Sequence, residues 1–256
     1  MQGTINKKTI DDIAAAIRSV NGSSVTYTPS EMEAAILALE DIILGGNGTV
    51  DTQLIDRSVT SIEDTNATKV ATRALNCCDL LTSASFAAAT SIGEKAFLKC
   101  AALQTLDIPQ CTEIMLGAFW NCTALTTVNS PSLQIVGEQA FLTCTSLTTI
   151  NVENVIQINP SGFESCKALE HLDFHIVQTI SRASFNGCSK LKELIIRSES
   201  VCTLSSTSAF SSTPIKSGTG YIYVPSVLIN TYKTATNWST FQAQFRAIED
   251  YPDICG

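Results

Sequence analysis

The chain has 256 residues, of which 45% are hydrophobic and 16% charged, so it can bury a core and is not disordered as a whole. The formal net charge of −8 argues against a nucleic-acid partner and against an anionic membrane surface, since both require clustered Lys and Arg. No apolar run reaches the roughly 18 residues needed for membrane insertion. The first residues show no apolar core of a secretory signal, so we expect cytoplasmic synthesis and leave surface or virion display open.

Residues 1–46 are predicted to form a hairpin of two short amphipathic helices. Thr9 and Ser30 each precede an acidic residue by three positions, which is the spacing of a capping box at a helix start. This segment either covers the first repeat or forms a separate attachment or oligomerisation module, and the glycine-rich residues 45–48 favour a tether. The segment resembles helical modules of phage tail-associated proteins. The apolar stripes comprise Ile10, Ile13 and Ile17, then Met32, Ala35, Ile36, Leu39 and Ile43.

A 22-residue repeat occupies residues 47–225. Each clear unit has an aromatic residue, a cysteine three positions later and a leucine three positions after that. Further apolar columns follow, and chance cannot keep so many columns in phase. A degenerate unit precedes the clear ones, at Val59, Ile62 and Val70, and a last one reaches 221–224. The aromatic column comprises Phe97, Phe119, Phe141, Phe163 and Phe185, with Leu75 at the preceding position.

The pattern within one unit predicts a short helical turn followed by a strand. Residues 93–100 form the turn, which points Phe97 and Cys100 inward, and the alternation of Leu106 with Ile108 is typical of a strand with one buried face. The chain then returns through Ile114 to the next unit. No unit can bury its apolar face alone, so we expect an α/β solenoid of leucine-rich-repeat type with a parallel sheet along one side.

The repeat pattern, Ala-Phe-x-x-Cys-x-x-Leu followed by a further apolar position, resembles the BspA-type leucine-rich repeats of bacterial surface proteins. The resemblance covers residues 53–225, roughly two-thirds of the chain. It implies a right-handed, curved array that serves adhesion or recognition at a cell surface. It implies no catalytic residue.

Six cysteines share one column of the repeat. Stacked identical units point their side chains in parallel rather than toward each other, so we expect free, buried thiols that donate to loop backbone. Paired C-x₂-C zinc motifs are absent, and we predict neither a metal nor a cofactor. The column comprises Cys78, Cys100, Cys122, Cys144, Cys166 and Cys188.

Residues 226–256 are predicted to form a helical cap, which gives the chain helical segments at both ends. Ser226 and Asn237 are expected to begin one or two helices. The aromatic residues of this segment are expected to seal the last repeat rather than to bind a ligand. Near-helical spacing relates Leu228, Tyr232, Trp238, Phe241, Phe245 and Ile248.

No catalytic motif is apparent: the glycine-rich stretch lacks a following Lys-Ser or Lys-Thr, and neither histidine follows a nucleophile elbow. The sequence therefore predicts a non-enzymatic recognition or adhesion module that binds a protein or glycan. The alternative is a structural or assembly component, phage-tail-like or at the cell surface, in which the solenoid is a spacer.

The outward positions of the predicted strands form the candidate binding face, with a solvated surface as the plain alternative. Both histidines lie there and could make partner binding pH-sensitive. His175 with Asp173 and Glu153 could approach one ion, but no fixed spacing enforces a metal site. Ile195 is expected to point outward as well. The candidate binding residues are Asn129, Asn151, Glu153, His171, Asp173, His175, Glu193 and Arg197.

Overall fold

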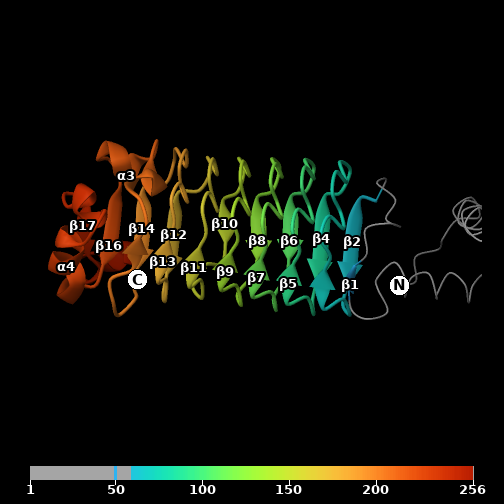
Figure 1. Cartoon of the computed structure of the whole chain (residues 1–256), viewed down its shortest axis with the longest axis horizontal. Coiled ribbons are helices and arrows are strands. Elements are labelled where there is room, and N and C mark those ends of the chain that lie inside the picture. Colours follow the sequence, from blue (N-terminus) through green and yellow to red (C-terminus); the bar gives the residue numbers. More distant parts are fainter. Residues whose placement is uncertain (1–48, 51–58, 256) are drawn as a thin grey trace, which may run out of the picture.

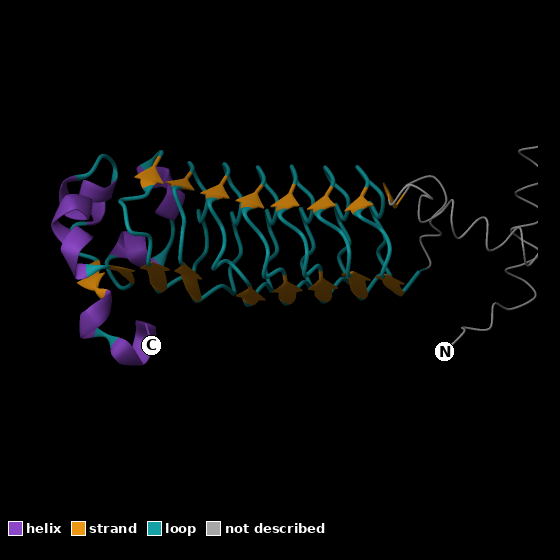
Figure 2. Ribbon diagram, turned by 90° about the horizontal axis from the view of Figure 1, so that it is seen from below, coloured by secondary structure: helices purple, strands orange, loops and turns teal. Residues whose placement is uncertain are grey.

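The computed structural model describes residues 49–50 and 59–255. Figure 1 shows the repeats as successive coils stacked side by side in one row, with the C-terminal elements at one end. Figure 2 shows the same row from below, and neither view shows the curvature that the resemblance implies. The helical hairpin expected for residues 1–46 lies outside the described residues.

Each unit contributes two short parallel strands, one to each of two opposite sides of the solenoid (Figure 2). The expectation of a sheet along one side only was therefore wrong, because the returning segment through Ile114 also pairs with its neighbours. This second side is one eight-stranded sheet, here called the back sheet. Its strands are β1 (Thr49–Val50), β3 (Lys69–Val70), β5 (Ser91–Ile92), β7 (Glu113–Ile114), β9 (Ile135–Val136), β11 (Gln157–Ile158), β13 (Thr179–Ile180) and β15 (Thr203–Leu204).

The opposite side carries two separate parallel sheets, here called the front sheets. The first has five strands and the second has four, and the ladder between β10 and β12 is missing. The five are β2 (Ser61–Asp64), β4 (Ser83–Phe86), β6 (Thr105–Asp107), β8 (Thr127–Asn129) and β10 (Thr149–Ile150). The four are β12 (His171–Phe174), β14 (Glu193–Ile196), β16 (Tyr221–Val224) and β17 (Phe245–Ala247).

The segment before each front strand consists of successive turns rather than the predicted helical turn. Lys95 and Lys99 have φ values of 54° and 62°, a left-handed conformation that an α-helix does not contain. These turns pair with the next unit, so the third side of the solenoid is hydrogen-bonded too. The amides of Lys95, Phe97 and Lys99 donate to the carbonyl oxygens of Leu116, Ala118 and Trp120 at 2.9, 2.7 and 2.8 Å.

The interior is filled by the repeated columns that the sequence predicts. Neighbouring Phe rings stack along the array, with centroids 4.9 Å apart for Phe97 and Phe119 and 5.2 Å apart for Phe141 and Phe163. The prediction of buried thiols bonded to loop backbone is confirmed: the described ladder cysteines are free and buried. Cys122 Sγ, for example, donates to the carbonyl oxygen of Phe97 at 3.1 Å. The same bond recurs for Cys144, Cys166 and Cys188, each one unit further along.

The C-terminal segment closes the array as expected, although its secondary structure differs from the prediction. Phe245 lies in strand β17 rather than in a helix. Asn237 begins the short 3-10 helix η3 (Trp238–Phe241) as expected, but its side chain does not cap that helix and its Nδ2 group instead donates to the carbonyl oxygen of Leu204 at 2.7 Å. Trp238 packs against Phe210, the last ring of the stack, with centroids 5.9 Å apart. The 3-10 helices of this segment are η1 (Thr207–Phe210), η2 (Ser226–Leu228), η3 (Trp238–Phe241) and η4 (Ile248–Asp250). The short α-helices are α3 (Pro214–Ser217), α4 (Ile229–Thr234) and α5 (Pro252–Cys255).

Candidate functional site

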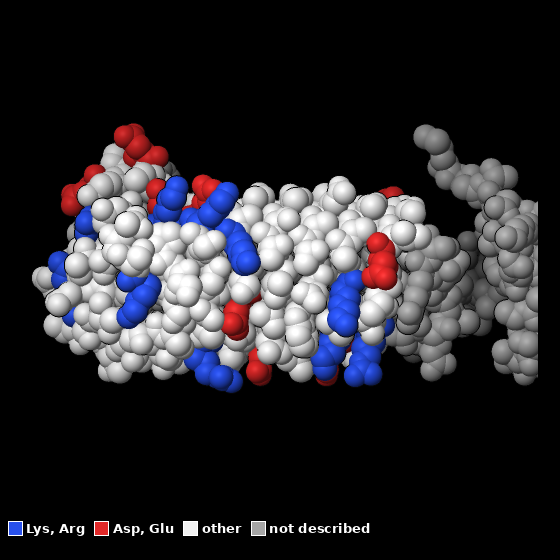
Figure 3. Space-filling view, turned by 90° about the horizontal axis from the view of Figure 1, so that it is seen from above, with Lys and Arg blue, Asp and Glu red and all other residues white. Residues whose placement is uncertain are grey.

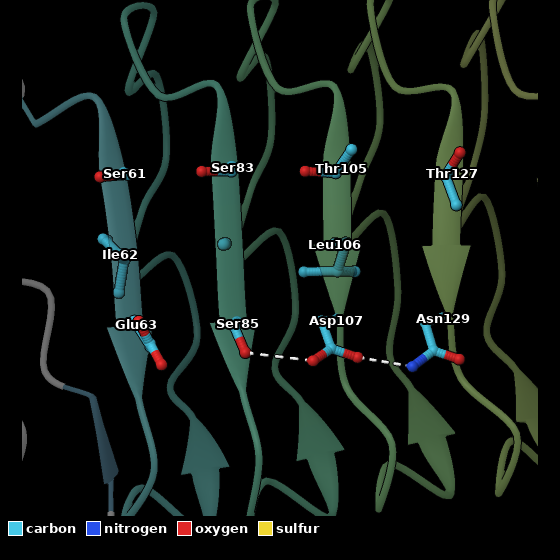
Figure 4. Close-up of a pocket in the computed structure, with 11 residues that line it drawn as sticks. Ser61, Ile62, Glu63, Ser83, Ser85, Thr105, Leu106, Asp107, Thr127 and Asn129 are labelled. Atoms are coloured by element: carbon cyan, nitrogen blue, oxygen red, sulfur yellow. Dashed lines mark hydrogen bonds between the residues drawn. The ribbon is translucent and has the colours of Figure 1, made fainter.

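The front strands present alternate side chains to solvent, because successive residues of a strand point to opposite sides. Figure 4 shows the outward residues of β2, β4, β6 and β8 aligned in rows across the sheet. They form the floor of a shallow groove of about 520 Å³. Its polar lining is Ser61, Glu63, Ser83, Ser85, Thr105, Asp107, Thr127 and Asn129.

Hydrogen bonds across the units fix the outward side chains of this groove. Asp107 accepts from Asn129 Nδ2 at 2.6 Å and from Ser85 Oγ at 3.3 Å, so three successive strands are linked (Figure 4). Asn151 does not extend the row, because its Oδ1 accepts from the backbone amide of Ser130 at 3.1 Å. Of the predicted site residues, Asn129 therefore lines the groove, whereas the side chain of Asn151 is bonded to the backbone of the preceding unit.

The predicted residues of the last units form two clusters of charged side chains. His171 Nδ1 lies 3.1 Å from Glu193 Oε2 on the neighbouring strand, in register with it. Asp173 accepts a bidentate pair of bonds from Arg197, with Nε at 2.9 Å from Oδ1 and Nη2 at 2.8 Å from Oδ2. His175 Nε2 lies 3.9 Å from the same carboxylate. The sequence thus identified residues that do come together.

Glu153 does not join this cluster through its carboxylate. Its backbone carbonyl oxygen accepts from the amide of His175 at 3.1 Å. The residues that the structure describes contain no group of three His, Cys, Asp or Glu side chains placed to hold a metal ion. His175, Asp173 and Glu153 therefore do not form the three-ligand arrangement that was considered as an alternative.

Ile195 does not point into solvent, and that expectation was wrong. It is fully buried against Tyr223, and Tyr221, Ile248, Tyr251 and Ile254 pack around the pair. The C-terminal segment thus covers the front face at its last strands. Tyr221 and Tyr223 pair in register with Glu193 and Ile195 over a separation of 28 residues, which the 22-residue period of the sequence does not predict.

Charge is distributed unevenly along the array. The sequence has no Lys, Arg or His between Lys99 and Lys167, so the central units are neutral or acidic. Figure 3, which views the array from above, shows a stretch of uncharged surface between the charged side chains of the first units and those of the last. The groove itself carries Glu63 and Asp107 and no basic side chain.

The outward Ser and Thr residues of the first groove strands were not predicted as site residues, because a single Ser or Thr carries no distinctive chemistry. Their common signal is that all occupy the same outward columns as Asn129 and His171. Over the described residues, no helix is both long enough and apolar enough to cross a membrane.

Stacked 22-residue units with parallel strand ladders and buried leucine, phenylalanine and cysteine columns define a leucine-rich-repeat solenoid. The family model for the BspA type Leucine rich repeat region matches residues 57–133 and 112–237. These ranges cover more than half of the chain, so the chain belongs to this family.

Two solved structures share the fold. A leucine-rich repeat protein from Bacteroides ovatus is 22% identical with a TM-score of 0.56, over 78% of this chain and 54% of that one. The chain therefore spans only about half the length of that protein. A leucine-rich repeat protein from T. pallidum is 23% identical with a TM-score of 0.51, over 72% of this chain and 79% of that one. No curated protein matches the chain. The predicted phage-tail-like module at residues 1–46 is not supported by the family model, which matches residues 57–133 and 112–237, or by the structural matches.

Proposed function

We propose that this chain is a non-enzymatic recognition and adhesion module whose front face binds a protein or glycan partner, with the chain displayed on a bacterial surface. The observation that carries the proposal is the groove of about 520 Å³ over β2, β4, β6 and β8, lined by outward polar side chains from four consecutive units. Membership of the BspA-type leucine-rich-repeat family supports a binding role, because stacked repeats of this kind create extended binding surfaces.

The groove is suited to binding because Ser85, Asp107 and Asn129 are already held by hydrogen bonds between units. Ser and Thr lose little rotamer entropy on binding, and Asp107 is held from both sides by Ser85 and Asn129. The acidic side chains and the absence of basic ones favour a partner that is neutral or basic at the contact. The hydrogen-bonded pair His171–Glu193 and the ion pair Asp173–Arg197 would form the polar rim of the interface.

The test is a binding screen with the full chain on a printed glycan array and on an array of purified cell-surface proteins. We expect a specific partner whose affinity falls at least tenfold in Thr105→Arg/Thr127→Arg, which crowds the groove. The matched control is Gln157→Arg/Thr203→Arg, which places the same charges on the back sheet. A partner that binds both variants equally, or no partner on either array, would overturn the proposal.

The charged rim is tested separately with His171→Ala/Asp173→Ala/His175→Ala. We expect a weaker reduction of partner affinity than in the groove variant, because these side chains already pair with one another. Unchanged affinity in the folded variant would remove the rim from the proposed interface.

The alternative role in assembly depends on residues 1–46, which the sequence predicts to be helical and to be followed by a glycine-rich stretch. Under this proposal the helices oligomerise and the solenoid is a spacer on a virion or cell surface. Removing these residues would then convert an oligomer into a monomer in light scattering. A monomeric full chain would reject it.

A further inference from the structure

The front side of the solenoid is interrupted at one step, here called the seam, between β10 and β12. In the preceding step the amides of Thr148 and Thr149 both donate to the carbonyl oxygen of Thr126, at 3.0 and 3.1 Å. At the seam, within the residues that the structure describes, no backbone hydrogen bond links the carbonyl oxygen of Thr148 to Glu170 or His171. The pattern resumes at once, since Lys192 and Glu193 donate to Glu170.

The seam coincides with a change in side-chain size in the inward column that follows. Ser130 and Val152 occupy this column before the seam, and Phe174 and Ile196 occupy it afterwards. Phe174 is fully buried and its ring centroid lies 6.4 Å from that of Phe185. Only one end of the seam opens, because the amide of His175 still donates to the carbonyl oxygen of Glu153.

The opening produces a hollow of about 420 Å³ at the start of the two strands. Ile150 and Ala168 supply the apolar surface of this hollow. The exposed fraction of Ile150 is 9%, whereas Val128 and Leu172, at the equivalent positions of the neighbouring units, are 0% and 2% exposed. Thr149 and His171 border the hollow from the front face. A hollow of this size lies within the range of small-molecule sites, roughly 300–1,000 Å³.

We infer that the seam is a subsite for one neutral sugar residue of a glycan. This inference deepens the proposed function and rests on it. The carbonyl oxygen of Thr148 and the amides of Glu170 and His171 offer an acceptor and two donors that the neighbouring unit does not use. Sugar hydroxyls both donate and accept, so they match this mixed set, while the C–H face of a sugar ring matches Ile150 and Ala168.

The charged side chains at the hollow favour a neutral ligand over an anion. Lys190 Nζ lies 3.4 Å from Glu170 Oε1, so this cation is balanced by a carboxylate, and His171 Nδ1 lies 3.1 Å from Glu193 Oε2. An anion would therefore meet carboxylates as well as cations. Because β11 and β13 remain paired directly behind the seam and hold the two units at strand spacing, no ligand inserts fully between the units, and the sugar would lie in the mouth of the hollow.

The experiment titrates the ¹⁵N-labelled full chain with lactose, maltotriose, cellotriose and triacetylchitotriose, each to 20 mM, and follows the backbone amides by NMR. We expect at least one sugar to shift the amides of Glu170 and His171 in a saturable manner. Sodium sulfate serves as the anion probe and is expected to leave these amides unchanged.

Two variants locate the binding. Ala168→Phe fills the apolar floor and is expected to weaken the sugar at least tenfold, while Ala124→Phe, at the equivalent half-buried position two units earlier, is expected to change affinity less than twofold. Thr149→Val gives a second, smaller perturbation if Ala168→Phe does not fold.

The inference is overturned if none of the four sugars shifts these amides, if sulfate alone does, or if both phenylalanine variants bind equally. Failure of the seam is distinguishable from failure of the proposed function. A partner that still depends on Thr105 and Thr127 but ignores Ala168→Phe would leave the groove as the interface and reject the seam.

Discussion

The two front sheets have the same parallel backbone arrangement, but their outward side chains differ in charge and polarity. Across β2 to β10 the outward side chains are mostly hydroxyls and amides, linked by single hydrogen bonds such as Asn129 to Asp107. Across β12 to β17 they become ion pairs and then tyrosines, which the C-terminal segment covers. The inward columns are mostly apolar in both sheets, with Asp64 and Ser130 as buried polar exceptions. The comparison teaches that inward columns set the scaffold, while outward columns are free to change their binding properties from unit to unit.

The largest expected effect tests whether the interior is equivalent in the two halves. Leu125→Ala in the first half and Leu191→Ala in the second should each lower the free energy of unfolding by about 2–5 kcal/mol, since both leucines are fully buried between neighbouring units. Val59→Ala should cost clearly less, because Val59 is only half-buried in the first described unit. Urea denaturation measures all three. Equal losses at Val59 and Leu125 would contradict the stacking argument.

The next effect concerns the cysteine column, which runs through both halves. Burial raises the pKa of Cys144 and Cys166 well above the usual 9.0, and that of Cys188 to about 12. These thiols stay protonated when folded but ionise when unfolded, so stability is fully present below pH 9 and falls as the pH rises from there toward 12. Each such thiol contributes about 1.4 kcal/mol per pH unit to this decline.

The pH dependence is tested by comparing the parent chain with the variant Cys144→Ala/Cys166→Ala, both under reducing conditions. This variant should be less stable at pH 7, but its free energy of unfolding should fall less steeply between pH 9.5 and 10.5 than that of the parent chain. Parallel slopes for the two proteins would show that the thiols do not remain protonated in the folded state.

A smaller effect concerns the inward column that changes size at the seam. Ser130 Oγ is buried and has no hydrogen-bond partner among the described residues, where the same column holds Ile108 and Val152 in the flanking units. Ser130→Val should therefore raise the free energy of unfolding by about 1 kcal/mol. Ser184→Ala is the contrast, because Ser184 Oγ donates to the carbonyl oxygen of Ser181 at 2.7 Å, and its loss should destabilise the chain.

The smallest effect compares the outward carboxylates of the two halves. Asp173→Asn removes the charge that Arg197 pairs with, at side-chain exposures of 24% and 29%, and should cost about 0.5–1 kcal/mol at low salt. The cost should shrink in 1 M NaCl, because salt screens partly exposed charges. Asp107→Asn, whose partners are neutral, should show no such salt dependence. Denaturation at the two salt concentrations distinguishes the cases.

Much of the fold was predictable because the interior repeats. A residue between two identical neighbours meets the same packing demand in every unit, so Phe97, Cys100 and Leu103 recur at a fixed interval. The turns were not predictable in detail. Lys95 and Lys99 adopt left-handed φ values without being glycine, and only some units, such as that of Gly117, show the residue that favours this conformation. The back strands were missed as a sheet because two residues are too few to show alternation.

The sequence by itself determined the unit length, the inward columns, the free cysteine ladder and the polar character of the outward positions, because each depends on residues at a fixed spacing along the chain. Only the tertiary structure decided which outward residues are available. Ile195 is buried because the C-terminal segment folds back over β14 and β16, and the strand ladder is interrupted between β10 and β12. Both features depend on how different units of the solenoid contact one another, and the residue pattern within a single unit does not specify those contacts.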